Sequence, residues 1–238
     1  MLTALALAAT ILIDDRPGFS DTPIIPGTKW RVHDKERPHP RKKNPVAWDG
    51  KPVPAPMGAV VPTWSNPSWK LANGDLQVQQ GANLTKEAFG SGRYHIEWRT
   101  PVDNYKDQGS GNSGVFLMGE YEIQILNCFN NVTYADGHAG SIYGQTPPSS
   151  NPCRPQGEWQ TYDIDFVAPV FAMDGSLKSP ATVTLVFNGV RVLNKTKVMG
   201  QTAYRAVAKY AYHAPKLPLM LQDHGSPVEF RNIWVVPK

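Results

Sequence analysis

From residue 69 onward, apolar and polar residues alternate with a period of two, the pattern of β-strands that bury one face. No window of a dozen residues sustains the period of an α-helix. Short strands without helical partners predict an all-β fold, a two-sheet antiparallel sandwich. The predicted strands cover residues 69–72, 75–79, 94–99, 114–118, 121–126, 159–166, 182–187, 190–193, 218–222 and 228–236.

Two Asn-Gly pairs fall between predicted strands and favour tight hairpins. Asn73-Gly74 separates residues 69–72 from 75–79, and Asn188-Gly189 separates 182–187 from 190–193. Asparagine and glycine tolerate the positive φ that both central residues of a type I′ turn require. We therefore expect a two-residue hairpin at each pair.

The first quarter of the chain has a different character. Residues 1–13 are apolar but too short to span a bilayer, and they resemble the remnant of an export signal, with a buried first strand as the alternative. Residues 14–60 are rich in proline and other turn formers, which predicts an extended arm over a sandwich at 61–238. The export signal predicts a periplasmic or secreted protein, and no integral membrane segment is expected.

Composition supports this organisation and excludes several classes. The 20 glycines and 22 prolines disfavour a helical bundle, and the aromatic content of 10% disfavours disorder. The net charge is +4, and basic residues concentrate in the proline-broken segment 29–43. That placement is typical of a solvated arm rather than of a folded nucleic-acid-binding face.

The two cysteines, Cys128 and Cys153, exclude a structural zinc site because no Cys or His ligand spacing accompanies them. Both lie in loop-like sequence. In an exported protein they are expected to form a disulfide, and two free thiols are the alternative.

Alternation places ionisable and amide side chains on one face of several strands. His95, Glu97 and Arg99 share a face, as do Glu122 with Gln124. A third group, Gln222 and His224, lies near the C-terminus on one face. We expect these groups to converge in a groove on one concave sheet, with an ordinary solvated face as the alternative.

Familiar catalytic motifs are absent from the sequence: it has no nucleophile elbow, P-loop, dinucleotide fingerprint or HExxH. Glu120 and Glu122 are two apart, but Gln124 is an amide where sandwich glucanases carry a further acid. A conventional two-carboxylate endoglycosidase is therefore poorly supported.

Several strings in the same order resemble the 3-keto-disaccharide hydrolase family over about residues 60–238. They are Gly111-Asn-Ser-Gly-Val-Phe-Leu117, Tyr121-Glu-Ile-Gln-Ile-Leu-Asn127, Gly140-Ser-Ile-Tyr143, Gly157-Glu-Trp-Gln-Thr-Tyr-Asp163, Asn188-Gly-Val190 and Leu221-Gln-Asp-His-Gly-Ser-Pro-Val-Glu-Phe-Arg-Asn-Ile233. The leading arm looks like a variant seen in environmental bacteria. The resemblance implies a concanavalin-like or jelly-roll sandwich, export, and action on glycosides that a partner oxidoreductase has oxidised at C3.

The implied chemistry requires one base rather than two carboxylates. A C3 ketone acidifies the C2 proton, its removal gives an enolate that expels the C1 substituent, and water then adds to the enone. The enolate oxygen could be held by a divalent metal ion or by Arg, Gln and His donors.

Our site hypothesis places Glu122 and His224 at the centre as catalytic residues, one of them the base. With Glu97 they are the expected ligands of a divalent metal. The expected substrate-binding residues are Glu97, Asn112, Gln124, Tyr143, Trp159, Gln222 and Arg231. Alternatives stay open: His224 as the cap of a turn, Arg231 in a structural ion pair with Glu229 or another acid, and Trp159 in the core.

Two other functions compete with this hypothesis. The same sandwich could be a non-catalytic carbohydrate-binding module, because lectin-like sandwiches also present polar and aromatic residues on one sheet. The protein could also be a conventional endoglycosidase, and cleavage of an unmodified glucan would support that function.

Overall fold

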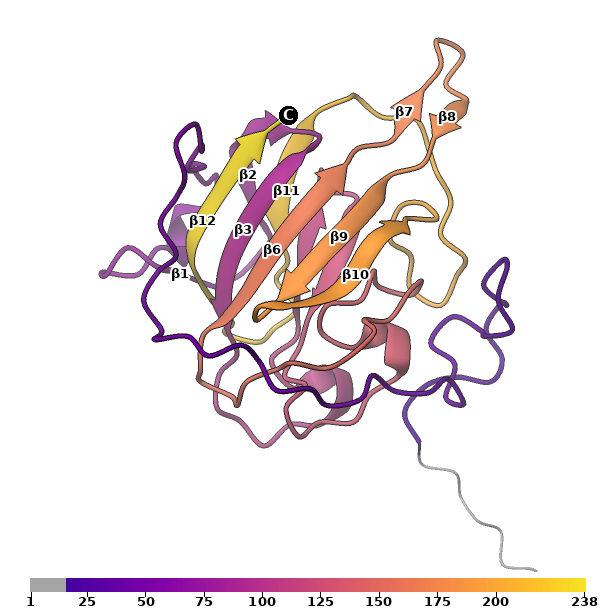
Figure 1. Ribbon diagram of the computed structural model, residues 1–238, viewed down its shortest axis with the longest axis horizontal. Helices are drawn as coiled ribbons and strands as arrows, with labels where there is room; N and C mark the ends of the chain where they lie inside the picture. The colour runs from indigo at the N-terminus through magenta and orange to yellow at the C-terminus, as the bar shows by residue number, and fades with distance from the viewer. Residues whose placement is uncertain (1–15) are drawn as a thin grey trace, which may run out of the picture.

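Two antiparallel sheets pack face to face in the computed structural model, which describes residues 16–238. The six-stranded sheet has the order β1-β12-β3-β6-β9-β10, the four-stranded sheet lies behind it in the order β2-β11-β4-β5, and β7 and β8 form a separate hairpin (Figure 1). The predicted two-sheet sandwich is confirmed. The expected export remnant at residues 1–13 lies outside the described residues.

The strands are β1 (Leu76–Gln77), β2 (Asn83–Phe89), β3 (Gly92–Arg99), β4 (Ser113–Leu117), β5 (Tyr121–Ile125), β6 (Gln160–Val167), β7 (Val170–Phe171), β8 (Leu177–Ser179), β9 (Thr182–Phe187), β10 (Val190–Lys197), β11 (Leu217–Leu221) and β12 (Glu229–Pro237). Short 3-10 helices cover Pro67–Trp69, Asp107–Gly109 and Ala135–Gly137. Among the described residues, no helix has the length and apolar character needed to cross a membrane.

The core lies between the sheets and follows the predicted alternation. On β5, Ile123 and Ile125 are fully buried in it, while Glu122 and Gln124 face outward from the sandwich. On β3, Trp98 enters the core and meets the ring of Tyr162 at 5.2 Å between centroids. Burying large side chains of this kind supplies most of the free energy that favours folding.

Only one of the two predicted Asn-Gly hairpins forms as expected. Asn188 and Gly189 have φ of 50° and 77° between β9 and β10, as a type I′ turn requires. At the other pair only Gly74 has a positive φ, and pairing is limited to a bridge between Lys70 and Leu76. The segment before that turn is not a strand because a 3-10 helix there directs Trp69 into the core.

Strand β2 is absent from the sequence prediction. Its apolar residues Leu84 and Phe89 are separated by an odd number of positions, so they do not share a face. The buried alternate positions instead hold Asn83 and Thr85. Hydrogen bonds satisfy both side chains, with Asn83 Oδ1 accepting from the Asn66 N–H at 2.8 Å and Thr85 Oγ1 accepting from the Leu219 N–H at 3.0 Å.

Residues 16–60 form no helix or strand beyond isolated bridges. They run along the loop end of the sandwich and then continue alongside β12 (Figure 1). Two apolar side chains of the arm, Ile25 and Val32, are buried, whereas Ile24 is half exposed. Val60 forms an isolated bridge with Val235 of β12. The arm therefore packs on both the loops and the sheet edge.

Candidate active site

A pocket of about 680 Å³ lies on the outer face of the four-stranded sheet. Strand residues form its floor, and four loops and the N-terminal arm form its walls. It brings together six of the predicted site residues: Asn112, Glu122, Gln124, Tyr143, Gln222 and His224. The other lining residues are Arg16, Pro17, Gly18, Phe19, Asp107, Gln108, Phe116, Tyr134, Thr202 and Tyr204.

Glu122 is the buried carboxylate on the floor of this pocket. It is 3% exposed and faces outward from β5 opposite Phe116 of β4. Burial raises the pKa of Glu122 to about 8. The Gln124 amide, in the orientation that satisfies both of its ends, donates to Glu122 Oε1 at 2.9 Å and to the Ser113 carbonyl oxygen at 3.0 Å. A carboxyl in this environment changes protonation near neutral pH.

Gly114 makes room for that carboxylate. A Cβ at this position would lie 2.5 Å from Glu122 Oε1 and 2.9 Å from a ring carbon of Phe116. Only glycine fits here without moving Glu122, and this explains the glycine in the Gly111–Leu117 string.

Polar groups around Glu122 are available to a ligand. Gln222 Oε1 is buried without a hydrogen-bond partner, so it can accept from a hydroxyl group. Asn112 is held in place by its Nδ2, which donates to the Gln108 carbonyl oxygen at 2.8 Å. His224 is exposed and follows β11 at the pocket wall.

Two tyrosines form one wall. The hydroxyl groups of Tyr134 and Tyr143 are 3.0 Å apart and share a hydrogen bond. Burial raises the pKa of both phenols well above their ordinary range, so they remain neutral donors. The sequence analysis identified Tyr143 but not Tyr134, because Tyr134 lies in a segment without the alternation that marks a strand.

The arm supports these tyrosines through His33, which sequence reasoning also missed. The His33 ring is fully buried, with centroids 4.1 Å from Tyr134 and 4.7 Å from Tyr143. Its backbone N–H donates to Asp136 Oδ2 at 3.0 Å, and its Nδ1 lies 3.1 Å from Asp136 Oδ1. The only signal in the sequence was a histidine inside the arm, and nothing local indicates that its partner lies 103 residues away.

The structure places Glu97, Trp159 and Arg231 away from this pocket, so the predicted single groove is wrong. Glu97 lies on β3 and Arg231 on β12, both in the six-stranded sheet, and Trp159 directly precedes β6 of that sheet. Glu122 belongs to the opposite sheet. The expected metal set of Glu97, Glu122 and His224 is therefore not assembled, and residues 16–238 contain no cluster of three His, Cys, Asp or Glu suited to a metal.

Glu97 is instead an internal anchor for the arm. It is fully buried and accepts hydrogen bonds from the Val53 N–H at 2.8 Å, Arg231 Nε at 2.7 Å and Asn232 Nδ2 at 2.7 Å. Burial opposes its ionisation, but the hydrogen bonds from His95 and these donors outweigh burial and lower the pKa of Glu97.

Arg231 pairs with Glu97 rather than with Glu229, which binds Arg99 at 2.6 Å. The guanidinium groups of both arginines lie over the Trp159 ring, at 4.7 Å for Arg99 and 4.1 Å for Arg231. Trp159 thus contacts two cations on the outer side of the six-stranded sheet rather than a ligand in the Glu122 pocket.

Cys128 and Cys153 are both buried free thiols, so the expected disulfide is not formed. Burial raises the pKa of each thiol above its ordinary value, which disfavours the reactive thiolate. Cys128 Sγ accepts a hydrogen bond from the Ala139 N–H. The two side chains serve as core residues.

Comparison with known proteins agrees with this architecture. Residues 28–236 match the family described as the 3-keto-alpha-glucoside-1,2-lyase-like domain. The chain belongs to this family, as the sequence motifs predicted, and the membership supports an enzyme that acts on glycosides. The match begins before residue 60, where the motif resemblance started, and so includes the part of the arm that carries His33.

A candidate glycosyl hydrolase from Parabacteroides distasonis ATCC 8503 is 36% identical to the chain, with a TM-score of 0.74. The likeness covers 85% of this chain and 93% of that one. A second candidate glycosyl hydrolase from the same organism is 20% identical over 75% of this chain and 92% of that one, with a TM-score of 0.51, and shows the fold alone. The comparison with curated proteins gives no match.

Replacing Glu97 tests its role as an anchor. We expect Glu97→Gln to lower the free energy of unfolding by about 3 kcal/mol, because it leaves the half-buried Arg231 without its counter-ion. Urea unfolding measures the change, with the exposed Glu158→Gln as the control, expected within about 0.5 kcal/mol of wild type. Equal stability of the two variants would contradict the anchor role.

The pKa of Glu122 predicts a pH dependence of stability. The carboxyl has an ordinary pKa of 4.5, against about 8 in the folded protein. The folded state therefore retains a proton that the unfolded chain loses, and this contribution to stability is present below pH 4.5 and lost as pH rises to about 8. In urea titrations from about pH 5 to about pH 8, wild type should lose more stability than Glu122→Gln. Glu120→Gln is the matched control and should keep the wild-type slope.

Proposed function

We propose that the protein cleaves α-glucosides whose sugar carries a ketone at C3, by removing the C2 proton and releasing the C1 substituent. The observation that carries the proposal is Glu122, a buried carboxyl with a pKa of about 8 on the floor of a pocket with neutral donors. A general base works best when its pKa lies near the working pH. The family description names the same class of substrate.

The proposed elimination uses Glu122 as the base. Its carboxylate takes the C2 proton, and the electron pair of the C–H bond forms an enolate with the C3 oxygen. When the enolate collapses, a C1–C2 double bond forms, the C1–O bond breaks, and the leaving oxygen takes a proton to depart as an alcohol. His224, exposed at the pocket wall, is the proposed donor of that proton.

Neutral donors complete the site. The Tyr143 hydroxyl is the proposed donor to the C3 oxygen, where negative charge develops in the enolate. Asn112 and Gln222 would bind sugar hydroxyl groups, consistent with the unpartnered Gln222 Oε1. Water then adds its hydroxyl group to C1 and gives its remaining proton to His224, while the proton on Glu122 returns to C2. These transfers give the free 3-keto sugar and restore both the Glu122 carboxylate and the protonated His224.

This chemistry explains the pocket better than conventional hydrolysis does. A conventional glycosidase needs two carboxylates that flank the scissile bond. Beside Glu122 on β5 the pocket presents the amide of Gln124, and Glu120 is not among its lining residues. The other carboxylate of the lining, Asp107, lies in the loop before β4 and not beside Glu122 on a strand. The substrate must already carry a ketone, so an oxidoreductase acting on C3 of the sugar is the proposed functional partner. Export to the periplasm or medium remains a prediction.

A divalent ion in this pocket remains a prediction, but with fewer protein ligands than the sequence analysis expects. Without Glu97, its protein ligands would be Glu122, His224 and the Gln222 oxygen, an oxygen and imidazole set that suits divalent cations. Because these groups would then hold the ion, this arrangement is an alternative to the roles of base and proton donor given above. Incubation with a chelator should then lower turnover, and adding back Mn²⁺ or Mg²⁺ should restore it. Unchanged turnover after exhaustive chelation would remove the ion from the mechanism.

Substitution of Glu122 tests the mechanism directly. With methyl 3-keto-α-glucoside as the substrate, Glu122→Gln should lower kcat by about 10²–10⁴-fold because the base is lost. Wild-type kcat/KM should rise with pH up to about 8, as the Glu122 carboxyl ionises. Deuterium at C2 should slow the wild-type reaction.

Two comparisons serve as controls for this experiment. Glu120→Gln, outside the pocket, should retain wild-type turnover. The unoxidised methyl α-glucoside should not react. Cleavage of the unoxidised glycoside, or binding of the 3-keto-glucoside without product release, would overturn the proposal in favour of a conventional glycosidase or a binding module.

A further inference from the structure

Three segments of the chain contain no acidic residue, although they are distant from one another in the sequence. They are residues 37–48 of the arm, residues 137–157 and residues 175–222, so all 20 acidic residues of the chain lie outside them. The same segments hold the basic residues Arg37, Arg41, Lys42, Lys43, Arg154, Lys178, Arg191, Lys195, Lys197, Arg205, Lys209 and Lys216. Segments of this kind give a positive surface where they meet.

The three segments meet at the edge of the six-stranded sheet that β10 forms. The Asn151 N–H donates to the Arg41 carbonyl oxygen at 2.8 Å, and the Lys43 N–H donates to the Asn151 carbonyl oxygen at 2.9 Å. The Ser149 N–H donates to the Val192 carbonyl oxygen of β10 at 3.0 Å. The loop that carries Ser149 and Asn151 therefore joins the basic part of the arm to the edge strand.

Basic side chains on this edge are exposed and form no ion pair. On β10, Arg191 and Lys197 lie on the outer face of the sheet, because their partners on β9 lie between the positions that enter the core. Arg41 and Lys43 are two apart in the extended arm, so their side chains share one side. None of the four forms a salt bridge with any residue of the described range, 16–238. Their charges are therefore available to an anionic partner.

Acidic residues of the same sheet do not neutralise this edge. Asp163 and Asp165 lie on β6, which β9 separates from β10. The Asp163 Oδ1 atom lies 2.9 Å from His95 Nδ1. The Asp165 Oδ1 atom accepts a hydrogen bond from Lys238 Nζ at 3.4 Å. Both carboxylates thus have partners of their own, and the edge keeps its positive charge.

A groove of about 340 Å³ lies between β10 and the loop at residues 146–149. Its polar lining residues are Thr146, Ser149, Arg191, Asn194 and Thr196. Hydroxyl and amide groups exchange hydrogen bonds with sugar hydroxyl groups, and a guanidinium such as that of Arg191 can bind a carboxylate through two parallel N–H bonds. None of the described residues that line the groove is aromatic, so it offers no ring on which a nucleobase could stack.

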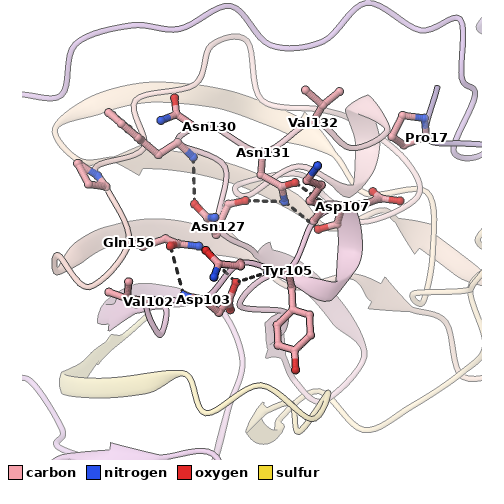
Figure 2. Close-up of a pocket in the computed structure, with 14 residues that line it drawn as sticks. Pro17, Val102, Asp103, Tyr105, Asp107, Asn127, Asn130, Asn131, Val132 and Gln156 are labelled. Carbon is pink, nitrogen blue, oxygen red and sulfur yellow. Dashed lines mark hydrogen bonds between the residues drawn. The ribbon is translucent and has the colours of Figure 1, made fainter. Parts of the chain in front are cut away.

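Lys42 belongs to a different surface. Its Nζ donates to Asn130 Oδ1 at 2.9 Å. Asn130 lines a pocket of about 900 Å³ at the loop end of the sandwich (Figure 2). Asp103 and Asp107 line the same pocket, and their carboxylates would repel an anionic ligand. This larger pocket therefore does not continue the positive edge of β10.

We propose that the β10 edge binds an acidic polysaccharide, a polymer of sugars that carry carboxylate groups. Arg191 and Lys197 bind the carboxylates, and the hydroxyl and amide groups of the groove bind sugar hydroxyl groups. Arg41 and Lys43 extend the positive surface along the arm. None of the described groove residues lines the Glu122 pocket, so a bound polymer leaves that pocket open. Such binding holds the protein on a glycan and does not require the chemistry proposed for Glu122.

Calorimetric titration with polygalacturonate tests this surface, with dextran as the neutral polymer. Wild type should bind polygalacturonate and not dextran. Raising the ionic strength from about 0.01 M to about 0.15 M should weaken the binding, because the Debye length falls from about 30 Å to about 8 Å. Arg191→Gln/Lys197→Gln should bind about tenfold more weakly, a loss of about 1.4 kcal/mol that two exposed ion pairs can supply. Arg41→Gln/Lys43→Gln should weaken binding by a similar factor.

Lys70→Gln/Lys86→Gln is the matched control, because it removes the same charge from two exposed lysines outside the three acid-free segments. It should retain wild-type binding. An equal loss in this control and in Arg191→Gln/Lys197→Gln would show that net charge alone attracts the polymer, and would overturn the proposal. Absence of polygalacturonate binding by wild type would overturn it as well. If duplex DNA binds more tightly than polygalacturonate and depends on Arg191 and Lys197, the edge is a nucleic-acid surface and the polysaccharide assignment is wrong.

Turnover of methyl 3-keto-α-glucoside separates this surface from the Glu122 pocket. All three double variants should turn over this small substrate at the wild-type rate, because none of the substituted residues lines that pocket. If wild type does not turn it over, the proposed function is wrong while the polysaccharide-binding result stands. If Arg191→Gln/Lys197→Gln loses turnover together with binding, the edge is not a separate binding surface and the proposal is wrong.

Discussion

Burial of the Glu122 carboxyl is the constraint that connects this fold to its chemistry. An outward-facing position on a β-sandwich is normally solvated, and a carboxyl there would ionise well below neutral pH. Here the loop that carries Tyr134 and Tyr143, together with residues 16–19 of the arm, covers the outer face of the four-stranded sheet. These segments exclude enough water from the carboxyl to raise the pKa of Glu122 to about 8, and between them a pocket remains open to a ligand.

The arm is therefore part of the site and not only a cover for the core. His33 packs on both pocket tyrosines and pairs with Asp136, so the position of one wall depends on a segment far away in the sequence. At its other end the arm is fixed on the opposite sheet, where the Val53 N–H donates to Glu97. Two buried acidic residues, Asp136 and Glu97, thus hold the arm against the two sides of the sandwich.

Alternation within a strand predicted which side chains share a face, and this succeeded for β3, β5 and the Asn188-Gly189 hairpin because these features are local. It could not predict which sheet each strand joins, because that depends on pairing between distant residues such as Glu97 and Arg231. Glu97 and Glu122 were therefore expected in one groove, although they lie on opposite outer faces. Most of the pocket floor was predictable from strands β4, β5 and β11, whereas Tyr134 and His33 lie in irregular segments without a periodic signal.

The contrast between Glu97 and Glu122 shows why burial alone does not identify a reactive carboxyl. Both are buried on outer faces and both lose the solvation of the charged form. Glu97 has a guanidinium, an imidazole, an amide and a backbone N–H as partners, and together they lower its pKa. Glu122 has the neutral Gln124 amide and no cation among its hydrogen-bond partners, so desolvation dominates and its pKa rises. The carboxyl with incomplete partners is the one that can exchange a proton with a ligand, and it is also the one that opens into a pocket. The hydrogen-bonding capacity of Glu97 is used by groups of the arm and of its own sheet, so none is left for a substrate.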